Sequence, residues 1–316
     1  MSKNSEIYDV IIIGGGPAGL SAALYTARAT LKTLVIDKSP SAGALGLASK
    51  IQNYPGIPGT STGEEILNVM RDQAREFGAE YIQEQVVGVN FTKEMKEIFT
   101  SKNQYTGKAV IVATGSMGRK PGIPGEQELM GRGVSKCATC DAFFFQQKTV
   151  ALLVSSIEVA LEELPTLLNF IGKAYFFSYK SLTEEQRTYL EGEENVIVME
   201  KARVQEIIGE NEVEAIKYKD NTGELKTISV EGVFLYLQGN VPIVDFLEGA
   251  LSLSDKGCID VDPHTMQTSR PAVFAAGDVT CKEIRQAILA SAEGVIAALS
   301  AEKYVNQKKG YKFQWS

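Results

Sequence analysis

The chain has 316 residues, 44% of them hydrophobic and 22% charged, which is the composition of a folded protein and excludes a disordered or low-complexity chain. Its 32 basic and 39 acidic side chains give a net charge of -7, which disfavours binding to nucleic acid or to an anionic membrane. The length allows two domains, and the first apolar run is too short for a signal peptide or a membrane span. We therefore expect a cytoplasmic protein whose partners are small molecules or other proteins.

The first predicted elements form a βαβ unit. Residues 8–13 are a continuous apolar run, typical of a strand buried on both faces, and residues 20–29 have helical spacing before a second strand at 31–37. The turn between them reads GGGPAG, a GxGxxG pattern in which the glycines allow a tight turn and a close approach of pyrophosphate. Asp37 ends the second strand, where a carboxylate accepts hydrogen bonds from ribose hydroxyls. The pattern predicts a dinucleotide site, with a purely structural glycine turn as the alternative.

A pair of cysteines three residues apart, Cys137 and Cys140, is the next feature with a chemical meaning. In a reducing compartment a CxxC pair is more often catalytic or metal-binding than a structural disulfide. A structural zinc site usually needs a second CxxC or a histidine pair, and His264 is the only histidine, so no metal is expected. Asp141 follows the pair directly and is either a general acid or a helix cap.

Two later strands end in turns that also suit a dinucleotide. Residues 109–115 form a strand that ends in Ala113-Thr114-Gly115, and residues 273–278 form a strand that ends in Gly277-Asp278. A helix containing Arg285, Gln286 and Ala287 follows the second of these turns. With the first turn, this trio resembles the flavoprotein disulfide reductases that have two dinucleotide-binding domains.

Four stretches narrow the resemblance to the low-molecular-weight thioredoxin reductases, in order and over nearly the whole chain. They read NYPGIPG (53–59), ATGSMGRKPGIPGE (113–126), GVSKCATCDAFFF (133–145) and FAAGDVTCKEIRQAILASAEGVIAAL (274–299). The resemblance implies an α/β chain with two Rossmann-like, three-layer ββα domains, the second inserted in the first. The FAD-binding domain is then 1-117 plus 244-316, and 118-243 is an NADPH-type domain that carries the dithiol.

The same resemblance assigns roles to single residues. It implies that Cys140 faces the flavin, that Cys137 attacks the disulfide of the partner, and that Asp141 is the general acid. It implies a homodimer in which the dithiol domain rotates. Residues near Gly118 and Gly239-Asn240 are the predicted hinges, because few residues there resist a change in φ and ψ, and a domain fixed in one orientation is the alternative. The FAD-binding residues that it implies are Gly14, Gly16, Pro17, Ala18, Gly19, Asp37, Lys38, Asn53, Val86, Ala113, Thr114, Gly115, Gly277, Asp278, Arg285, Gln286 and Ala287.

The second nucleotide turn departs from the family pattern. Residues 148–168 begin like a nucleotide-binding strand that enters a helix, but the positions of the glycines hold Val154, Ser155 and Ser156, with Val159 at the close-packing position. Side chains there block the approach of pyrophosphate. In the strand expected at 173–181, the place of the family's basic cluster for the 2′-phosphate is taken by Phe177, Ser178 and Tyr179, and only Lys180 remains. NADPH is therefore not expected to bind.

The loss of this site points to another electron donor. The sequence resembles the branch of these reductases that works without pyridine nucleotides, the ferredoxin-dependent flavin thioredoxin reductases and the related diflavin-linked disulfide oxidoreductases. In that interpretation reduced ferredoxin reduces FAD, FAD reduces the dithiol, and the dithiol reduces thioredoxin. Whether a second FAD is bound is left open. The alternatives are a thioredoxin reductase that uses a reduced pyridine nucleotide in an atypical way, and a non-enzymatic flavin and dithiol redox sensor.

The last part of the chain leaves three smaller questions. Cys258 and Cys281 have no CxxC arrangement and are expected to be packing residues, with a redox role for Cys281 left open. Aromatic residues near the end either stack over an open flavin face or pack on the surface; they are Tyr311, Phe313 and Trp315. Basic residues that either form patches for an acidic ferredoxin or are only solvated are Arg119, Lys120, Arg132, Lys308 and Lys309.

Overall fold

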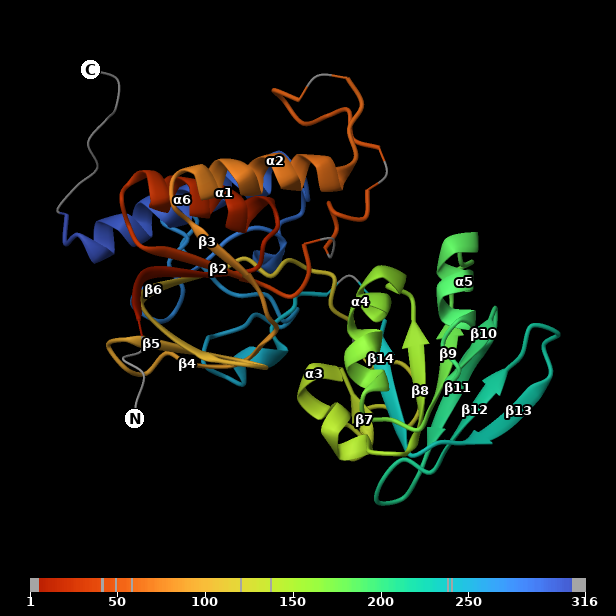
Figure 1. The fold of residues 1–316 in the computed structure, drawn as a ribbon. Coiled ribbons are helices and arrows are strands. Elements are labelled where there is room, and N and C mark those ends of the chain that lie inside the picture. Colours follow the sequence, from red (N-terminus) through yellow and green to blue (C-terminus); the bar gives the residue numbers. More distant parts are fainter. Residues whose placement is uncertain are drawn as a thin grey trace. The chain divides into compact units, whose positions relative to one another are not determined.

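The computed structural model describes residues 6–40, 43–48, 50–57, 59–119, 121–136, 138–237, 239 and 241–308. The chain divides into two compact units (Figure 1). The first unit comprises Met1–Gly118 and Asn240–Ser316, and the second comprises Arg119–Gly239. No helix within the described ranges is long and apolar enough to cross a membrane.

The first unit is built on one sheet with the strand order β3-β2-β1-β6-β5-β4, in which β15 also pairs with β6. Strands β1, β2, β3, β6 and β15 run parallel to one another, β5 is antiparallel to β6, and β4 is antiparallel to β5. The strands are β1 (Ile7–Ile13), β2 (Thr33–Asp37), β3 (Glu80–Gln83), β4 (Val86–Asn90), β5 (Lys96–Thr100), β6 (Gln104–Val112) and β15 (Val273–Ala275). The strands predicted around 8–13, 31–37, 109–112 and 273–275 are confirmed.

Three helices cover one face of this sheet and lie side by side (Figure 1). They are α1 (Pro17–Arg28), α2 (Gly63–Glu76) and α6 (Ala287–Val305). Val10 and Ile12 of β1 pack with the alanines of α1 and α6, while Ile11 and Ile13 pack in the core on the opposite face, as the alternation along a strand requires. The alanine-rich helix predicted after the first turn is confirmed.

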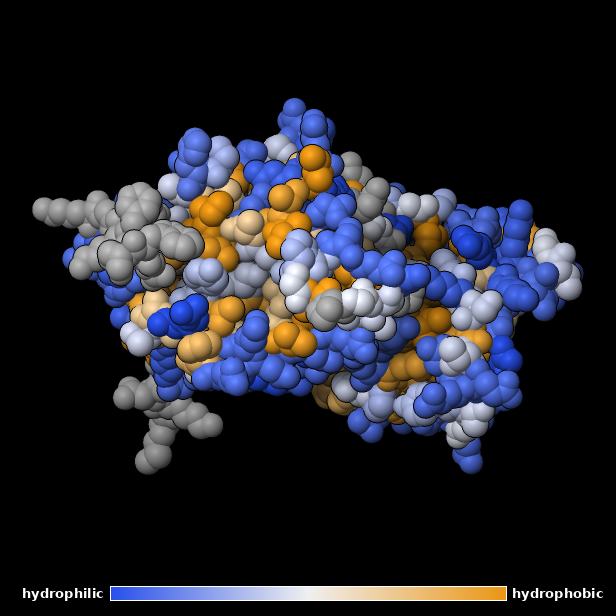
Figure 2. All heavy atoms as spheres, turned by 90° about the horizontal axis from the view of Figure 1, so that it is seen from above, coloured by the Kyte–Doolittle hydropathy of each residue, from blue (hydrophilic) through white to orange (hydrophobic). Residues whose placement is uncertain are grey.

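The outer surface on the side of these helices is mixed in character. Figure 2 shows several separate hydrophobic patches within a mostly hydrophilic surface. Exposed apolar side chains of the three helices are Tyr25, Val69, Ile288, Leu289 and Tyr304. Isolated apolar residues of this kind are common on folded proteins.

The second unit contains a parallel sheet with the order β10-β9-β8-β14-β7 and an antiparallel sheet with the order β11-β12-β13. The strands are β7 (Val134–Ser135), β8 (Thr149–Val154), β9 (Lys173–Ser178), β10 (Val196–Glu200), β11 (Arg203–Ile208), β12 (Ala215–Lys219), β13 (Leu225–Ser229) and β14 (Gly232–Tyr236). The helices are α3 (Ala138–Asp141), α4 (Ile157–Leu168) and α5 (Glu184–Glu191).

The parallel sheet of the second unit is buried on both faces. Val150 and Leu152 of β8 pack with apolar residues of α4, and Ala151 and Leu153 pack with apolar residues of the antiparallel sheet. This explains why β8 reads as a continuous apolar run. The predicted α/β class with parallel sheets is confirmed for both units.

Candidate functional site

The carboxyl ends of β1, β6 and β15 meet at one edge of the first sheet. The peptide N–H of Ala113 donates to the carbonyl of Ile13, and that of Ala276 donates to the carbonyl of Val112, at 2.8 and 3.0 Å. The turns that follow these strands are therefore neighbours, although they are far apart in the sequence. Ligands of open α/β sheets bind at this kind of edge.

The three glycines of the GxGxxG pattern differ in what a side chain would meet at each position. Gly14 has a φ of +109°, and a Cβ there would lie 2.4 Å from the carbonyl oxygen of Ala113. A Cβ on Gly19 would lie 1.9 Å from the carbonyl oxygen of Gly14, so helix and turn touch through backbone atoms. A Cβ on Gly16 would meet nothing within 4 Å, and Gly16 begins α1 without a side-chain cap. The open space and the uncapped N–H groups of the first helical turn suit a pyrophosphate.

Asp37 is held at the end of β2 by three donors. The hydroxyl of Tyr81 donates to its carboxylate at 2.6 Å, and the peptide N–H groups of Gly15 and Lys38 also donate to it. Burial raises the pKa of the Asp37 carboxyl, although these hydrogen bonds and the charge of Arg71 act to lower it. Tyr81 was not predicted from the sequence, because it reaches Asp37 from 44 residues away.

Polar contacts join the segments around the Gly277-Asp278 turn. The amide of Asn53 donates to the side chain of Gln286 at 3.2 Å, and the guanidinium of Arg285 donates to the hydroxyl of Ser116 at 3.1 Å. The peptide N–H of Gly277 donates to the carboxylate of Glu293 at 2.8 Å. These contacts gather several predicted residues at one edge, and Ser116 and Glu293 are additions that no sequence motif indicated.

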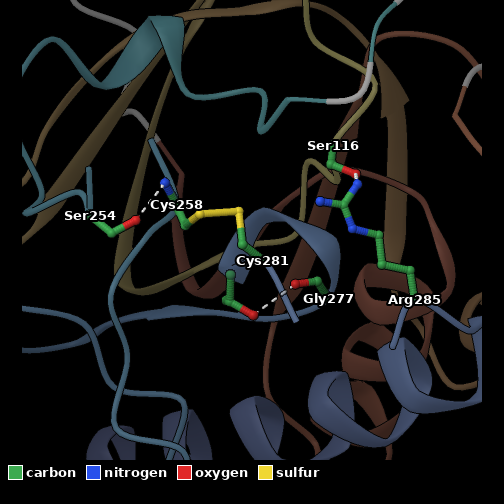
Figure 3. The surroundings of a disulfide bond; sticks show 7 residues. Ser116, Ser254, Cys258, Gly277, Cys281 and Arg285 are labelled. Carbon is green, nitrogen blue, oxygen red and sulfur yellow. Dashed lines mark hydrogen bonds between the residues drawn. A yellow bond between two sulfur atoms is a disulfide. The ribbon is translucent and has the colours of Figure 1, made fainter. Parts of the chain in front are cut away.

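The expectation that Cys258 and Cys281 are separate packing residues is wrong. They form a disulfide with a Cα–Cα distance of 5.6 Å (Figure 3). The loop between them folds back so that the peptide N–H of Ile259 donates to the carbonyl of Val279 at 3.1 Å. A spacing rule cannot find such a pair, because 23 positions separate the two cysteines. In a chain-entropy model, closing a loop of this length stabilises the fold by roughly 3 kcal/mol.

The dithiol segment includes the short helix α3, which lies between β7 and the 3₁₀ turn Ala142–Phe145 that precedes β8. Cys137 and the side chain of Cys140 lie outside the described residues. The carboxylate of Asp141 accepts a hydrogen bond of 2.6 Å from the hydroxyl of Ser135, which is buried in β7. Asp141 therefore has a fixed orientation at the carboxyl end of the CxxC segment.

A second carboxylate lies at the other end of α3. Glu163 of α4 accepts hydrogen bonds from the peptide N–H of Ala138 at 3.3 Å and from the hydroxyl of Tyr236 at 3.1 Å. Burial first, and the nearby charge of Glu163 second, raise the pKa of Tyr236 well above its ordinary value, so this phenol stays a donor. Glu163 is therefore held at the first residue of α3, which lies between Cys137 and Cys140 in the sequence.

We expect Glu163→Gln to lower the pKa of the more reactive thiol of the pair by about one unit, because a nearby negative charge disfavours a thiolate. Alkylation by iodoacetamide below that pKa then becomes about tenfold faster. Tyr236→Phe should change the profile less, since the carboxylate remains. The pH dependence of the alkylation rate measures both effects. An equal shift in the control Glu162→Gln, which changes an exposed neighbour, would contradict a specific role for Glu163.

The backbone donors of the turn between β8 and α4 are bonded to the neighbouring strand β14. The peptide N–H groups of Ser155 and Ser156 both donate to the carbonyl oxygen of Tyr236, at 2.9 and 3.0 Å. Only these two residues separate β8 from α4, and Glu158 stands in the first turn of that helix. An acidic side chain there repels a phosphate. The first turn has the opposite character, since α1 has no acidic residue in its first turn.

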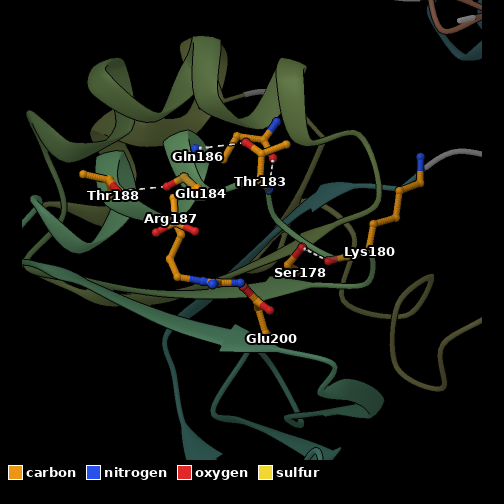
Figure 4. Close-up of polar contacts among 8 residues, drawn as sticks. All are labelled: Ser178, Lys180, Thr183, Glu184, Gln186, Arg187, Thr188 and Glu200. Carbon is orange, nitrogen blue, oxygen red and sulfur yellow. Dashed lines mark hydrogen bonds and ion pairs between the residues drawn. The ribbon is translucent and has the colours of Figure 1, made fainter.

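The end of β9 is also occupied by internal contacts. The strand stops at Ser178, three residues before the end predicted at 181, and the Ser178 hydroxyl donates to the carbonyl of Lys180 at 2.6 Å. Arg187 is paired with Glu200 at 2.6 Å, while the side chain of Lys180 points away from this pair (Figure 4). Two acidic residues, Glu184 and Glu185, open α5. The residues named here form no basic cluster, but the guanidinium of Arg203 lies over the ring of Tyr179, 5.4 Å from its centroid.

Comparisons with known proteins agree over nearly the whole chain. The family model for pyridine nucleotide-disulphide oxidoreductases matches residues 8–294. A thioredoxin reductase from Aquifex aeolicus is 42% identical over 320 residues, which cover 100% of this chain and 98% of the relative.

Two solved structures are similar to this one. A thioredoxin reductase from Gloeobacter violaceus has a TM-score of 0.92 at 41% identity, covering 98% of both chains. A ferredoxin-flavin thioredoxin reductase from Clostridium acetobutylicum has a TM-score of 0.80 at 30% identity, covering 96% of this chain and 99% of the other. On this evidence the chain belongs to the pyridine nucleotide-disulphide oxidoreductase family, and it is a disulfide reductase of the thioredoxin reductase type.

Proposed function

We propose that the protein passes electrons from reduced ferredoxin through FAD to Cys137 and Cys140 and on to thioredoxin, without NADPH. The observation that carries the proposal is the pair of hydrogen bonds from the Ser155 and Ser156 N–H groups to the Tyr236 carbonyl. Backbone donors at such a turn bind pyrophosphate in a working dinucleotide site. Here they already have an acceptor inside the protein.

The first turn fits the FAD that the proposal needs. Gly16 opens onto free space, Gly19 is required for close packing, and Asp37 is held for the ribose hydroxyls. The remaining proposed contacts come from Pro17, Ala18, Lys38, Asn53, Val86, Ala113, Thr114, Gly115, Gly277, Asp278, Arg285, Gln286 and Ala287. When bound, FAD supplies the step between one-electron and two-electron transfer.

The charge around β9 argues against NADPH in the second unit. Each hydrogen bond between a charged side chain and a phosphate contributes about 1.5–3 kcal/mol. Arg187 is already paired with Glu200, and Glu184 and Glu185 add negative charge nearby. A nucleotide phosphate near Arg187 would therefore gain few favourable contacts, whereas Arg203, which lies over the Tyr179 ring at 5.4 Å from its centroid, remains a basic side chain beside the end of β9.

The proposal that ferredoxin is the donor rests on the loss of the nucleotide site and on similarity to the Clostridium ferredoxin-flavin enzyme. The basic patches considered from the sequence give it less support. Arg119 is paired with Glu126 and Lys308 with Glu302, so either side chain would have to give up an ion pair to bind an acidic ferredoxin. Lys120 and Lys309 lie outside the described residues, as do the aromatic residues Tyr311, Phe313 and Trp315.

In the proposed reaction the dithiol of the second unit carries the electrons to a protein. Cys137 attacks one sulfur of the thioredoxin disulfide, and Cys140 then displaces the reduced thioredoxin, so two electrons and two protons leave the pair. Asp141, oriented by Ser135, moves a proton at this step. Phe143 and Phe144 follow the pair and are 62% and 69% exposed, which suits contact with a protein acceptor.

Use of a reduced pyridine nucleotide is the second candidate, and the description of the matching family favours it. Steady-state assays separate the two. With thioredoxin disulfide as acceptor, we expect turnover with photoreduced ferredoxin and none above background with NADPH. The absence of turnover with either donor would favour a flavin and dithiol redox sensor instead of an enzyme.

Three further features belong to the same proposal. The two units are interpreted as dinucleotide-binding domains with three ββα layers, residues 118-243 being inserted between 1-117 and 244-316. The chain forms a homodimer, and the dithiol domain rotates at residues near Gly118 and Gly239; the third predicted hinge residue, Asn240, lies outside the described residues. Flavin absorbance per chain after gel filtration tests whether one FAD or two are bound.

A further inference from the structure

The Cys258–Cys281 disulfide joins two tight turns of the first unit (Figure 3). Cys258 closes a turn in which the peptide N–H of Ser254 donates to the Cys258 carbonyl at 2.9 Å. The Cys258 N–H in turn donates to the Ser254 hydroxyl at 3.2 Å. Cys281 directly follows the 3₁₀ turn Asp278–Thr280. The disulfide thus connects a surface turn to the turn that carries Gly277 and Asp278.

Hydrogen bonds and an ion pair connect Cys281 and its neighbours to the Gly277-Asp278 turn. Its peptide N–H donates to the carbonyl of Asp278 at 3.0 Å, and the hydroxyl and the N–H of Thr280 both donate to the carbonyl of Gly277 at 2.9 Å. The next residue, Lys282, lies 3.7 Å from the carboxylate of Glu293, which accepts the Gly277 N–H. Movement of Cys281 is therefore transmitted to both residues of this turn.

The backbone of Cys281 needs a restraint. Its φ is +54°, in the left-handed region that residues with a Cβ rarely adopt. The disulfide holds it there by linking it to Cys258, which is anchored in its own turn. Without the bond, residues 281–286 are restrained only by their polar contacts, among them those of Lys282 with Glu293 and of Arg285 with Ser116. Relaxation there loosens the turn and the arginine together.

The two cysteines differ in exposure. Cys258 is only 5% exposed, whereas Cys281 is partly exposed and stands beside Lys282. A thiolate that arrives from solution therefore attacks Cys281, and the positive charge of Lys282 favours the approach of a thiolate. A reductase of the thioredoxin reductase type works among dithiol proteins, which are reagents for this exchange.

We propose that the Cys258–Cys281 pair is a second thiol–disulfide exchange site, reduced by a dithiol protein such as reduced thioredoxin, and that its reduction weakens FAD retention. The thiolate of the dithiol protein bonds to the Cys281 sulfur, the Cys281–Cys258 bond breaks, and Cys258 leaves as a thiolate and takes a proton. The second thiol of the partner then displaces Cys281. The partner becomes a disulfide, and the pair gains two electrons and two protons. Oxidised thioredoxin reverses the exchange.

The effect on FAD rests on the proposed function, because it assumes that Gly277, Asp278 and Arg285 hold that cofactor. The exchange itself does not depend on which donor reduces the flavin. Reduced thioredoxin, the product of the proposed reaction, would therefore inhibit the enzyme. A high ratio of reduced to oxidised thioredoxin reduces the Cys258–Cys281 disulfide and speeds the loss of FAD.

The test uses the full chain with Cys137→Ser and Cys140→Ser, so that only the second pair can exchange. The protein is equilibrated with thioredoxin at defined ratios of reduced to oxidised form, quenched with acid and labelled with a maleimide. Mass spectrometry of the peptides then reports the fraction of the pair that is reduced. The release of FAD is followed in parallel by the rise in flavin fluorescence on dilution.

We expect the pair to become reduced as the ratio rises, and the reduced form to release FAD at least tenfold faster. A pair that stays oxidised in excess reduced thioredoxin would overturn the proposal, and so would reduction without a change in FAD release. A chain that purifies without flavin would instead show failure of the proposed function. An inactive ferredoxin assay with normal exchange would leave this inference standing.

Two variants separate the backbone restraint from loss of folding. Cys258→Ala with Cys281→Ser should release FAD as fast as the reduced protein, whatever the thioredoxin ratio. Cys258→Ala with Cys281→Gly should release it more slowly, because glycine adopts a positive φ without strain. Equal release by both variants would show that the conformation of residue 281 is not the link, and would overturn that step of the mechanism.

Discussion

Gly16→Ala is expected to weaken FAD binding about 10- to 100-fold while leaving the fold intact. A Cβ at this position meets no protein atom within 4 Å, so the apoprotein should unfold at the same denaturant concentration as the unchanged chain. The same Cβ fills the space in which we propose that the pyrophosphate binds, and overlap of this kind typically costs about 1–3 kcal/mol. Flavin titration and urea unfolding of the apoprotein measure the two quantities.

Gly19→Ala is the matched variant, three residues along the same turn. Its Cβ would lie 1.9 Å from the carbonyl oxygen of Gly14, and a backbone atom cannot move aside cheaply. We expect a loss of about 3 kcal/mol in the free energy of unfolding of the apoprotein, together with loss of FAD. If Gly16→Ala destabilised the apoprotein as much as Gly19→Ala, the open space at Gly16 would not be the ligand site that we propose.

The second large effect is expected from Cys140→Ser, which should reduce turnover of thioredoxin disulfide at least about 10³-fold. In the proposed role Cys140 receives electrons from the flavin, and a hydroxyl cannot form the disulfide that passes them on. Cys137→Ser should lose turnover to a similar extent, because it removes the sulfur that attacks the partner. Stopped-flow assays with photoreduced ferredoxin and thioredoxin disulfide measure both losses.

The control in this series is the flavin itself. In the proposed route its reduction by ferredoxin precedes transfer to the dithiol, so the rate of flavin bleaching should be unchanged in both cysteine variants. Turnover within tenfold of the unchanged chain in Cys140→Ser would contradict the assignment. It would show that electrons leave the flavin by another route, for which the Cys258–Cys281 pair is the evident candidate.

The parts of the molecule that were predicted correctly from the sequence are those that depend on neighbours in the chain. Strand β1, its glycine turn and helix α1 follow from local apolar spacing and from the backbone demands of a tight turn. The replacement of glycine by Ser155 and Ser156 could also be predicted from the sequence, because the glycine pattern of a nucleotide-binding turn is local. The structure adds the physical consequence, which is that the N–H groups of both serines are bonded to Tyr236.

The contacts that the sequence did not reveal join residues far apart in the chain. Tyr81 reaches Asp37 across 44 positions, Tyr236 reaches Glu163 across 73, and Cys258 reaches Cys281 across 23. None of these pairs forms a motif with a fixed spacing. Their partners are chosen by the packing of strands and loops, so a single sequence gives no signal for them. The early end of β9 has a different, local cause, because the Ser178 hydroxyl donates to the carbonyl of Lys180, two residues further along the chain.

The most direct test of the central claim is anaerobic flavin reduction in the unchanged protein, followed by the loss of flavin absorbance after rapid mixing. We predict that photoreduced ferredoxin bleaches the flavin within the turnover time, and that micromolar NADPH leaves it oxidised over the same period. Rapid bleaching by micromolar NADPH would mean that a nicotinamide coenzyme binds productively despite the closed turn at Ser155 and Ser156, and would contradict the proposed electron route.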